Sequence, residues 1–174
     1  IDYPRSAFKV NIEGTFNVAQ ACVENKVKKL IYSSSASVYG DALEIPMKED
    51  HPYNNKNFYG ATKIAGEHIL RSYYYRHDLN FIGLRYMNVY GERQDYKGAY
   101  IAVIMKILDR LDNNLSPIID GDGSQALDFI NVEDCAIANI KAMKSNKRNE
   151  FYNVGTGKQT TLLELTNLIL KIYK

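Results

Sequence analysis

Two short segments of the chain carry side chains suited to proton and hydride chemistry. One is the hydroxyl-rich run from Ser33 to Gly40, and the other contains Tyr59 and Lys63, which are four residues apart. The apolar residues that follow Tyr59 recur at helical spacing, and side chains four apart on a helix share a face. A lysine ammonium so placed stabilises a phenolate, the form of tyrosine that removes a proton. Tyr59 and Lys63 are therefore a candidate acid-base pair.

The serine run follows the apolar segment from Leu30 to Tyr32, which predicts that its hydroxyls emerge at the carboxyl end of a buried strand. Ligands bind at that edge in open α/β sheets. Each motif also has a simpler interpretation. A tyrosine four residues before a lysine occurs by chance in many helices, and serines often end strands as turn formers. The surrounding elements must therefore support the chemical interpretation.

Up to Gly91 those elements alternate between helix and strand. We expect a helix from Pro4 to about Lys26, a strand over 30–33, a helix from Tyr59 to about His77 and a strand over 81–84. Such alternation predicts a doubly wound parallel sheet. Gly14 lies inside the first helix, where glycine costs about 1 kcal/mol relative to alanine, so it indicates close packing by another part of the chain.

After Gly91 the pattern changes to a polar loop and shorter elements. We expect strands over 117–119, 128–130 and 151–154, and helices over 99–111, from Asn131 onward, and from Thr161 to Tyr173. Asn131 suits a helix cap, and Thr161 with Glu164 has the spacing of a capping box. This change of pattern predicts a domain boundary near Gly91.

Composition narrows the class of protein. The chain has 174 residues, 45% hydrophobic and 24% charged, enough for one substantial core. Its 22 basic and 20 acidic residues are interspersed, which does not favour nucleic-acid binding, and no apolar run is long enough for a membrane helix. The three histidines lack metal-ligand spacing with the cysteines, so we expect no metal site. Cys22 and Cys135 lie in apolar helical patterns, which predicts buried thiols in a reducing compartment, the cytoplasm.

Four motifs, in this order, resemble those of the extended short-chain dehydrogenase/reductase family. Within that family the chain is most similar to NAD-dependent nucleotide-sugar epimerases and dehydratases, of the UDP-glucose 4-epimerase type. The motifs are Asn11-Ile12-Glu13-Gly14-Thr15, the serine run ending in Val38-Tyr39-Gly40, Tyr59-x-x-x-Lys63, and the segment from Leu84 to Gly91. Four motifs with family-like spacing are much more specific than any one of them.

The resemblance implies an α/β fold with part of a Rossmann-like, doubly wound parallel sheet, plus part of a small α/β substrate domain. Residues 1–91 would be the C-terminal part of the NAD-binding domain, and residues 92–174 part of the substrate-binding domain. Family members begin with a strand and a glycine-rich turn that holds the cofactor pyrophosphate. No such turn occurs in this sequence. We therefore expect an internal fragment of a longer protein, inactive by itself and without tight NAD binding.

The resemblance also implies the roles of individual residues. Tyr59 would remove the proton from a sugar hydroxyl while the sugar carbon gives hydride to NAD. Lys63 would bind the nicotinamide ribose and promote ionisation of Tyr59, and Ser35 would hydrogen-bond the same sugar oxygen. These three are the expected catalytic residues, and Tyr59 and Lys63 also belong to the expected cofactor site.

Further binding residues follow from the same resemblance. Asn11, Ser33 and Met87 would border the cofactor, and Asn88, together with Ser35, would bind the substrate, a UDP-sugar. The family also suggests a homodimer formed through the helices around Asn11 and Tyr59.

The sequence also indicates which branch of the family the chain resembles. Dehydratases have acidic residues after the catalytic hydroxyl, where Ala36 and Ser37 stand here, so epimerisation at C4 through a keto intermediate is preferred. The stretch from Arg93 to Tyr100 resembles epimerases that act on UDP-hexoses or their N-acetyl forms. A related dehydratase or reductase, and a non-catalytic domain that binds a nucleotide sugar or a partner, remain alternatives.

Two residues depart from the family pattern. Leu127 stands where the family usually has an arginine that pairs with the nucleotide diphosphate, and Glu92 replaces a usual proline. Loss of the arginine removes a charge-assisted contact worth roughly 1.5–3 kcal/mol. Either the diphosphate is held by other groups, or the protein has moved away from UDP-sugar chemistry.

Overall fold

A computed structural model describes residues 3–95 and 102–173 of the chain. It contains two compact units, and the chain passes between them more than once. The first unit comprises Ile1–Met87 and Cys135–Val154, and the second comprises Asn88–Asp134 and Gly155–Lys174. Each unit has its own sheets, so each is described separately.

The first unit is built on a parallel sheet in the order β1-β2-β6. The strands are β1 (Leu30–Ser35), β2 (Phe81–Tyr86) and β6 (Glu150–Val154). Ser34 lies opposite Arg85, and Arg85 lies opposite Asn153, so one row of polar residues crosses the sheet. The expected parallel α/β fold is confirmed.

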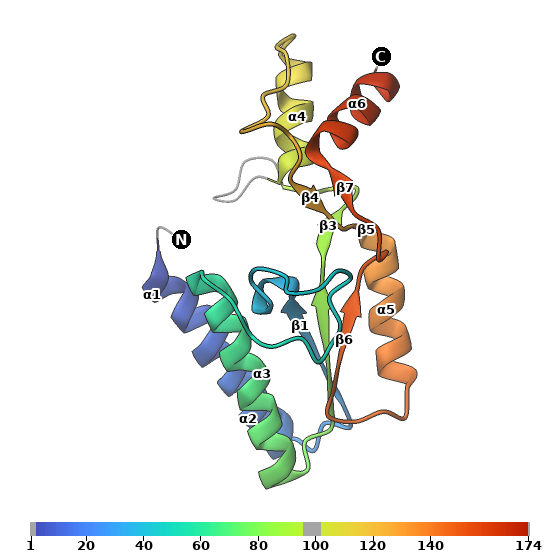
Figure 1. Ribbon diagram of the computed structural model, residues 1–174. Helices are drawn as coiled ribbons and strands as arrows, with labels where there is room; N and C mark the ends of the chain where they lie inside the picture. Colours follow the sequence, from blue (N-terminus) through green and yellow to red (C-terminus); the bar gives the residue numbers. More distant parts are fainter. Residues whose placement is uncertain (1–2, 96–101, 174) are drawn as a thin grey trace. The chain divides into compact units, whose positions relative to one another are not determined.

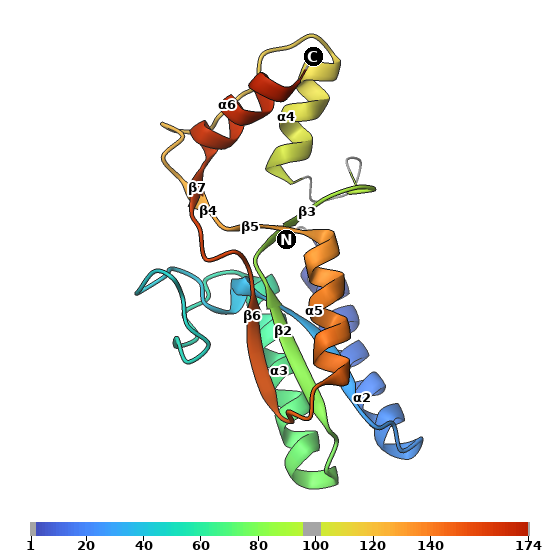
Figure 2. The ribbon, with the colours of Figure 1, turned by 90° about the vertical axis from the view of Figure 1, so that its right-hand side faces the viewer.

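Helices cover both faces of this sheet. The helices α2 (Gly14–Glu24) and α3 (Phe58–His77) lie on one side, and α5 (Val132–Lys144) lies on the other (Figures 1 and 2). The helix expected from Pro4 is continuous, with α1 (Pro4–Ala7) and the π-helical turn Phe8–Glu13 leading into α2. The core between α2, α3 and the sheet consists of Ala19, Cys22, Leu70, Leu79, Phe81 and Phe151.

The second unit contains shorter elements. Its β3 (Asn88–Tyr90) pairs in parallel with β5 (Phe129–Asn131), and β4 (Ala126–Leu127) pairs antiparallel with β7 (Thr160–Thr161). Its helices include α4 (Val103–Asp112) and α6 (Leu162–Ile172). The capping box predicted at Thr161 and Glu164 is present, and Asn131 accepts a hydrogen bond from the backbone N–H of Glu133, as predicted for a cap.

A predicted strand and the predicted domain boundary differ from the structure. Residues 117–119 form no strand, because an isolated run needs a neighbour to pair with its backbone groups, and here β4 and β7 pair with each other. The boundary predicted after Gly91 also differs, since the first division falls after Met87 and the segment Cys135–Val154 returns to the first unit. The cause is pairing of β6 with β2, a contact between residues distant in sequence.

Two helical glycines have different surroundings. A Cβ atom at Gly66 would lie 2.1 Å from the hydroxyl oxygen of Tyr32, so the absence of a side chain lets that hydroxyl reach α3. At Gly14, apart from its chain neighbours and the adjacent helix backbone, such a Cβ would meet among the described residues only the carbonyl oxygen of Lys9, at 3.6 Å. The close packing expected at Gly14 is therefore found at Gly66 instead.

This contrast gives a stability prediction for the chain. Gly66→Ala should lower the free energy of unfolding by about 1–3 kcal/mol, because Tyr32 must move. Gly14→Ala should raise it by up to about 1 kcal/mol through helix propensity. Urea denaturation of both variants checks the difference, and equal responses at the two sites would contradict the packing described here.

Candidate active site

Tyr59 lies at the start of α3, where Asn57 caps the helix. The side-chain oxygen of Asn57 accepts a hydrogen bond of 2.7 Å from the backbone N–H of Gly60, which fixes the first turn. Tyr59 is 37% exposed, and its hydroxyl has no hydrogen-bond partner in the part of the chain that the structure describes. A partly exposed tyrosine is thus presented by a capped helix end.

Lys63 lies one helical turn after Tyr59, as the sequence predicted. Its Nζ donates a hydrogen bond of 2.9 Å to the carbonyl oxygen of Ser33 and lies 5.6 Å from the centroid of the Tyr59 ring. Burial lowers the pKa of Lys63. An ammonium has three N–H donors, so two remain after the bond to Ser33.

Ser35 is the last residue of β1 and precedes a 3-10 turn, Ala36–Val38. Its Oγ donates to Ser37 Oγ at 3.1 Å and accepts from the backbone N–H of Ser37 at 3.2 Å. A Cβ atom at Gly60 would lie 2.4 Å from the carbonyl oxygen of Ser37. Glycine therefore lets the start of α3 lie directly against the turn that follows Ser35.

Asn11 lies in the π-helical turn and contacts α3. Its side-chain amide donates a hydrogen bond of 2.9 Å to Thr62 Oγ1, which in turn donates to the carbonyl oxygen of Tyr59 at 2.7 Å. Thr62 is buried and was missed by the sequence interpretation. Its position directly before Lys63 in Tyr59-Gly60-Ala61-Thr62-Lys63 is the signal that could have identified it.

The other predicted residues fall in different places. Met87 follows β2, and its backbone N–H donates to the carbonyl oxygen of Val154 at 2.9 Å. Asn88 begins β3 in the second unit, where its amide donates to the carbonyl oxygen of Asp128 at 3.1 Å. The structure thus brings Asn11, Ser33, Ser35, Tyr59 and Lys63 together within the first unit, whereas Asn88 belongs to the second.

Several further sequence observations concern the second unit. Leu127 pairs with Thr160 in the short antiparallel sheet, and Glu92 forms an exposed ion pair of 3.5 Å with Arg93. Of the epimerase-like stretch that ends at Tyr100, residues 96–100 lie outside the described residues.

Other classes of site were sought across the described residues. Within 3–95 and 102–173, no cluster of three or more histidine, cysteine, aspartate or glutamate side chains could hold a metal ion. No helix in the same ranges is both long and apolar enough to span a membrane. Cys22 and Cys135 are buried thiols, as predicted.

A parallel α/β sheet with a tyrosine-lysine pair beside a serine at the end of a strand defines a Rossmann-like protein of the short-chain dehydrogenase type. Residues 1–155 match the NAD dependent epimerase/dehydratase family. The chain belongs to this family.

Solved structures of related proteins support the same assignment. UDP-N-acetylglucosamine 4-epimerase from Methanobrevibacter ruminantium, in complex with UDP-N-acetylmuramic acid, is 38% identical with a TM-score of 0.91, over 95% of this chain and 53% of that one. UDP-glucose 4-epimerase from Thermotoga maritima, with UDP-glucose, is 32% identical with a TM-score of 0.94, over 99% and 56%. UDP-glucuronic acid 4-epimerase from Bacillus cereus, with UDP-glucuronic acid and NAD, is 30% identical with a TM-score of 0.85, over 95% and 52%.

The chain spans about half the length of the curated relatives it matches. What those relatives bind and catalyse therefore bears on this chain only as a proposal for the whole protein.

The lowered pKa of Lys63 predicts a pH effect on stability. The unfolded chain holds this proton up to about pH 10.5, whereas the folded chain releases it at a lower pH. The unfolded state then binds more protons in this window, so the contribution of Lys63 to the free energy of unfolding rises with pH.

Two measurements check this prediction. Carbon NMR of the lysine Cε should show Lys63 titrating below the ordinary range of a lysine side chain, and the stability difference between wild type and Lys63→Met should increase with pH. Lys56→Met serves as the matched control. A Lys63 resonance that titrates together with the exposed lysines would contradict the prediction.

Proposed function

We propose that the whole protein carrying this chain catalyses NAD-dependent epimerisation at C4 of a UDP-sugar, either a UDP-hexose or a UDP-N-acetylhexosamine. The observation that carries the proposal is the placement of the partly exposed Tyr59 one turn before Lys63 and beside the turn that follows Ser35. The family match and the three solved 4-epimerases support it.

The residues of this chain act on the proton. The Tyr59 phenolate takes the proton from the C4 hydroxyl of the sugar as the hydrogen on C4 leaves as hydride, so a ketone forms. Lys63 stabilises the phenolate by its charge, and Ser35 hydrogen-bonds the sugar oxygen throughout. The keto intermediate then rotates within the site. Tyr59 returns the proton while hydride returns to the opposite face of the sugar carbon. This inverts the configuration at C4 and balances the reaction.

NAD, when bound, accepts the hydride and then gives it back. The donor set fits this cofactor, since Lys63 has two N–H donors left for ribose hydroxyls after its bond to Ser33. We further propose that Asn11, Ser33 and Met87 border the cofactor and that Asn88 contacts the substrate near its diphosphate. Asn11 would act partly through Thr62, which holds the first turn of α3.

A non-catalytic nucleotide-sugar-binding domain is the second candidate, and Leu127 favours it. An apolar side chain there cannot pair with a diphosphate, so turnover requires that other groups bind this part of the substrate. A dehydratase is less favoured, because Ala36 and Ser37 supply no carboxylate to assist the loss of water.

Replacement of Tyr59 tests the catalytic proposal. In the whole protein, Tyr59→Phe should lower kcat by about 10²–10⁴-fold, the usual contribution of a general acid-base group. The assay is interconversion of candidate UDP-sugars, with bound NAD measured in the same samples. Tyr75→Phe is the matched control, because Tyr75 is 77% exposed on the same helix and should leave turnover unchanged. Full activity in Tyr59→Phe would disprove the acid-base role.

We also propose a homodimer formed through the first helices and α3. Large apolar side chains are exposed there, including Phe8, Val10, Phe16 and Phe58. Val10 is 68% exposed, so Val10→Glu should fold while a buried charge weakens association. Light scattering across protein concentration should show more monomer in this variant than in wild type. A monomeric wild type would refute the proposal.

A further inference from the structure

Tyr59, Lys63 and Glu67 follow one another at intervals of four residues along α3, so they form one stripe of that helix. Their exposure falls along the stripe, from 37% at Tyr59 to 0% at Glu67. A fully buried carboxylate is costly unless it is paired and fully hydrogen-bonded. The position of Glu67 below the acid-base pair therefore calls for a specific role.

Arg85 is the partner of Glu67. Its Nε donates to Glu67 Oε1 at 2.9 Å, and its Nη2 donates to Glu67 Oε2 at 2.7 Å, in the forked geometry that only arginine offers. Burial acts to lower the pKa of Arg85, but the hydrogen bonds to Glu67 outweigh this effect and raise it. This pair joins α3 to the central strand β2.

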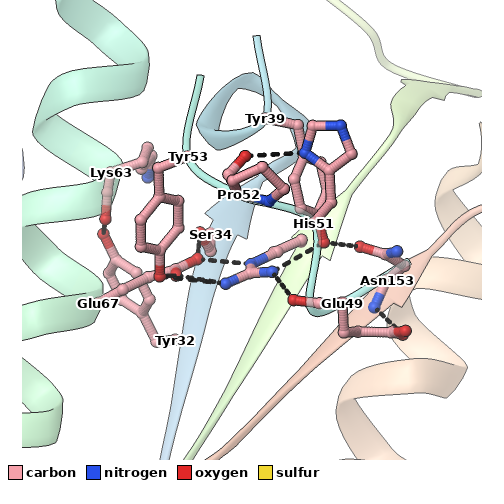
Figure 3. A network of polar contacts seen from close by, with 11 residues as sticks. Tyr32, Ser34, Tyr39, Glu49, His51, Pro52, Tyr53, Lys63, Glu67 and Asn153 are labelled. Carbon is pink, nitrogen blue, oxygen red and sulfur yellow. Dashed lines mark hydrogen bonds and ion pairs between the residues drawn. The ribbon is translucent and has the colours of Figure 1, made fainter. Parts of the chain in front are cut away.

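The remaining donors of Arg85 reach the segment that connects β1 to α3. Its Nη1 donates to the hydroxyl of Tyr39 and to the carbonyl oxygen of Glu49, both at 2.8 Å, and its Nη2 donates to the hydroxyl of Tyr53 at 3.2 Å. An arginine has five N–H donors, and all five are used here. Figure 3 shows Tyr39, Glu49 and Tyr53 gathered over the sheet.

The carboxylate of Glu67 also accepts hydrogen bonds from two residues other than Arg85. It accepts a hydrogen bond of 2.5 Å from Ser34 Oγ and one of 2.6 Å from the hydroxyl of Tyr53 (Figure 3). Burial raises the pKa of Tyr53 to about 12, so this hydroxyl remains a donor at neutral pH. Ser34 stands between Ser33, which accepts from Lys63, and Ser35, so the carboxylate fixes the strand residue at the centre of the site.

The connecting segment is also attached to the third strand. The hydroxyl of Tyr39 donates to the side-chain oxygen of Asn153 at 2.6 Å (Figure 3). The side-chain amide of Asn153 donates to the carbonyl oxygen of Met47 at 2.8 Å. Thus the strand that ends at Ser35, the helix that begins beside Tyr59 and the segment between them all depend on one buried ion pair.

We propose that Arg85 and Glu67 are positioning residues, which set the depth and rotation of α3 against β1 and so place Tyr59 and Lys63 relative to Ser35. This inference rests on the proposed function for its kinetic consequence. Because misplacement by about 1 Å can cost roughly 10²-fold in rate, a small loss of register between helix and strand lowers kcat without removing a catalytic group.

Arg85→Lys is the decisive variant, because it keeps the positive charge but removes the paired N–H donors that contact the two carboxylate oxygens of Glu67. In the whole protein, kcat per folded molecule should fall on the order of 10–100-fold while KM changes by less than about 3-fold. Tyr53→Phe, a milder change that removes one hydroxyl, should give a fall of about 3–10-fold in kcat, again at constant KM. Folded fraction is measured for each variant by chemical denaturation.

Lys56→Met is the matched control. Lys56 forms an exposed ion pair with Asp41 in the same connecting segment, so its loss should leave kcat and KM unchanged. Unchanged kcat per folded molecule in both Arg85→Lys and Tyr53→Phe would show that the pair only stabilises the fold, and would overturn the inference.

A second readout does not need enzymatic turnover. The NMR titration of Lys63 Cε should move toward that of ordinary lysines in Arg85→Lys, because a loosened helix admits water to the ammonium, and should not move in Lys56→Met. If wild type shows no epimerase turnover, the proposed function fails while this titration still decides the inference. An unmoved Lys63 titration in folded Arg85→Lys would overturn it.

Discussion

The buried ion pair between Arg85 and Glu67 is the interaction on which the rest of the first unit depends. Breaking such a pair by removing one partner costs about 3–5 kcal/mol, because an uncompensated charge remains in the interior. Here the cost of desolvation is offset because Glu67 accepts hydrogen bonds from the hydroxyls of Ser34 and Tyr53, and Arg85 donates to the hydroxyl of Tyr39 and the carbonyl oxygen of Glu49. The pair therefore joins α3 to β2 through directional contacts, which apolar packing alone does not supply.

Close approach of α3 to its neighbours supplies the second constraint. Gly60 lets the helix start contact the turn after Ser35, and Gly66 makes room for the hydroxyl of Tyr32. These glycines act through shape, while Arg85 and Glu67 act through charge and direction. The proposed site depends on both, since together they hold the helix that presents Tyr59 against β1 and the turn after Ser35.

The elements that carry the proposed site residues were largely predictable from sequence. The helix containing Tyr59 and Lys63, the strand ending in the serine run and the capping box at Thr161 are local features, governed by periodicity and by hydrogen bonds between near neighbours. The missed strand over 117–119 and the boundary placed after Gly91 show the limit of that method. Both depended on which distant strand supplies a hydrogen-bonding partner.

The sequence by itself determined the family, the helical spacing of Tyr59 and Lys63 and the fold class, because each rests on residue types at short spacing. Only the tertiary structure revealed the hydrogen bond between Asn11 and Thr62, the pairing of β6 with β2 and the ion pair between Arg85 and Glu67. These are contacts between residues far apart in sequence, and their strength comes from exclusion of water in the folded core. Short-range sequence patterns do not predict this exclusion of water, because it arises only after the strands and helices have packed.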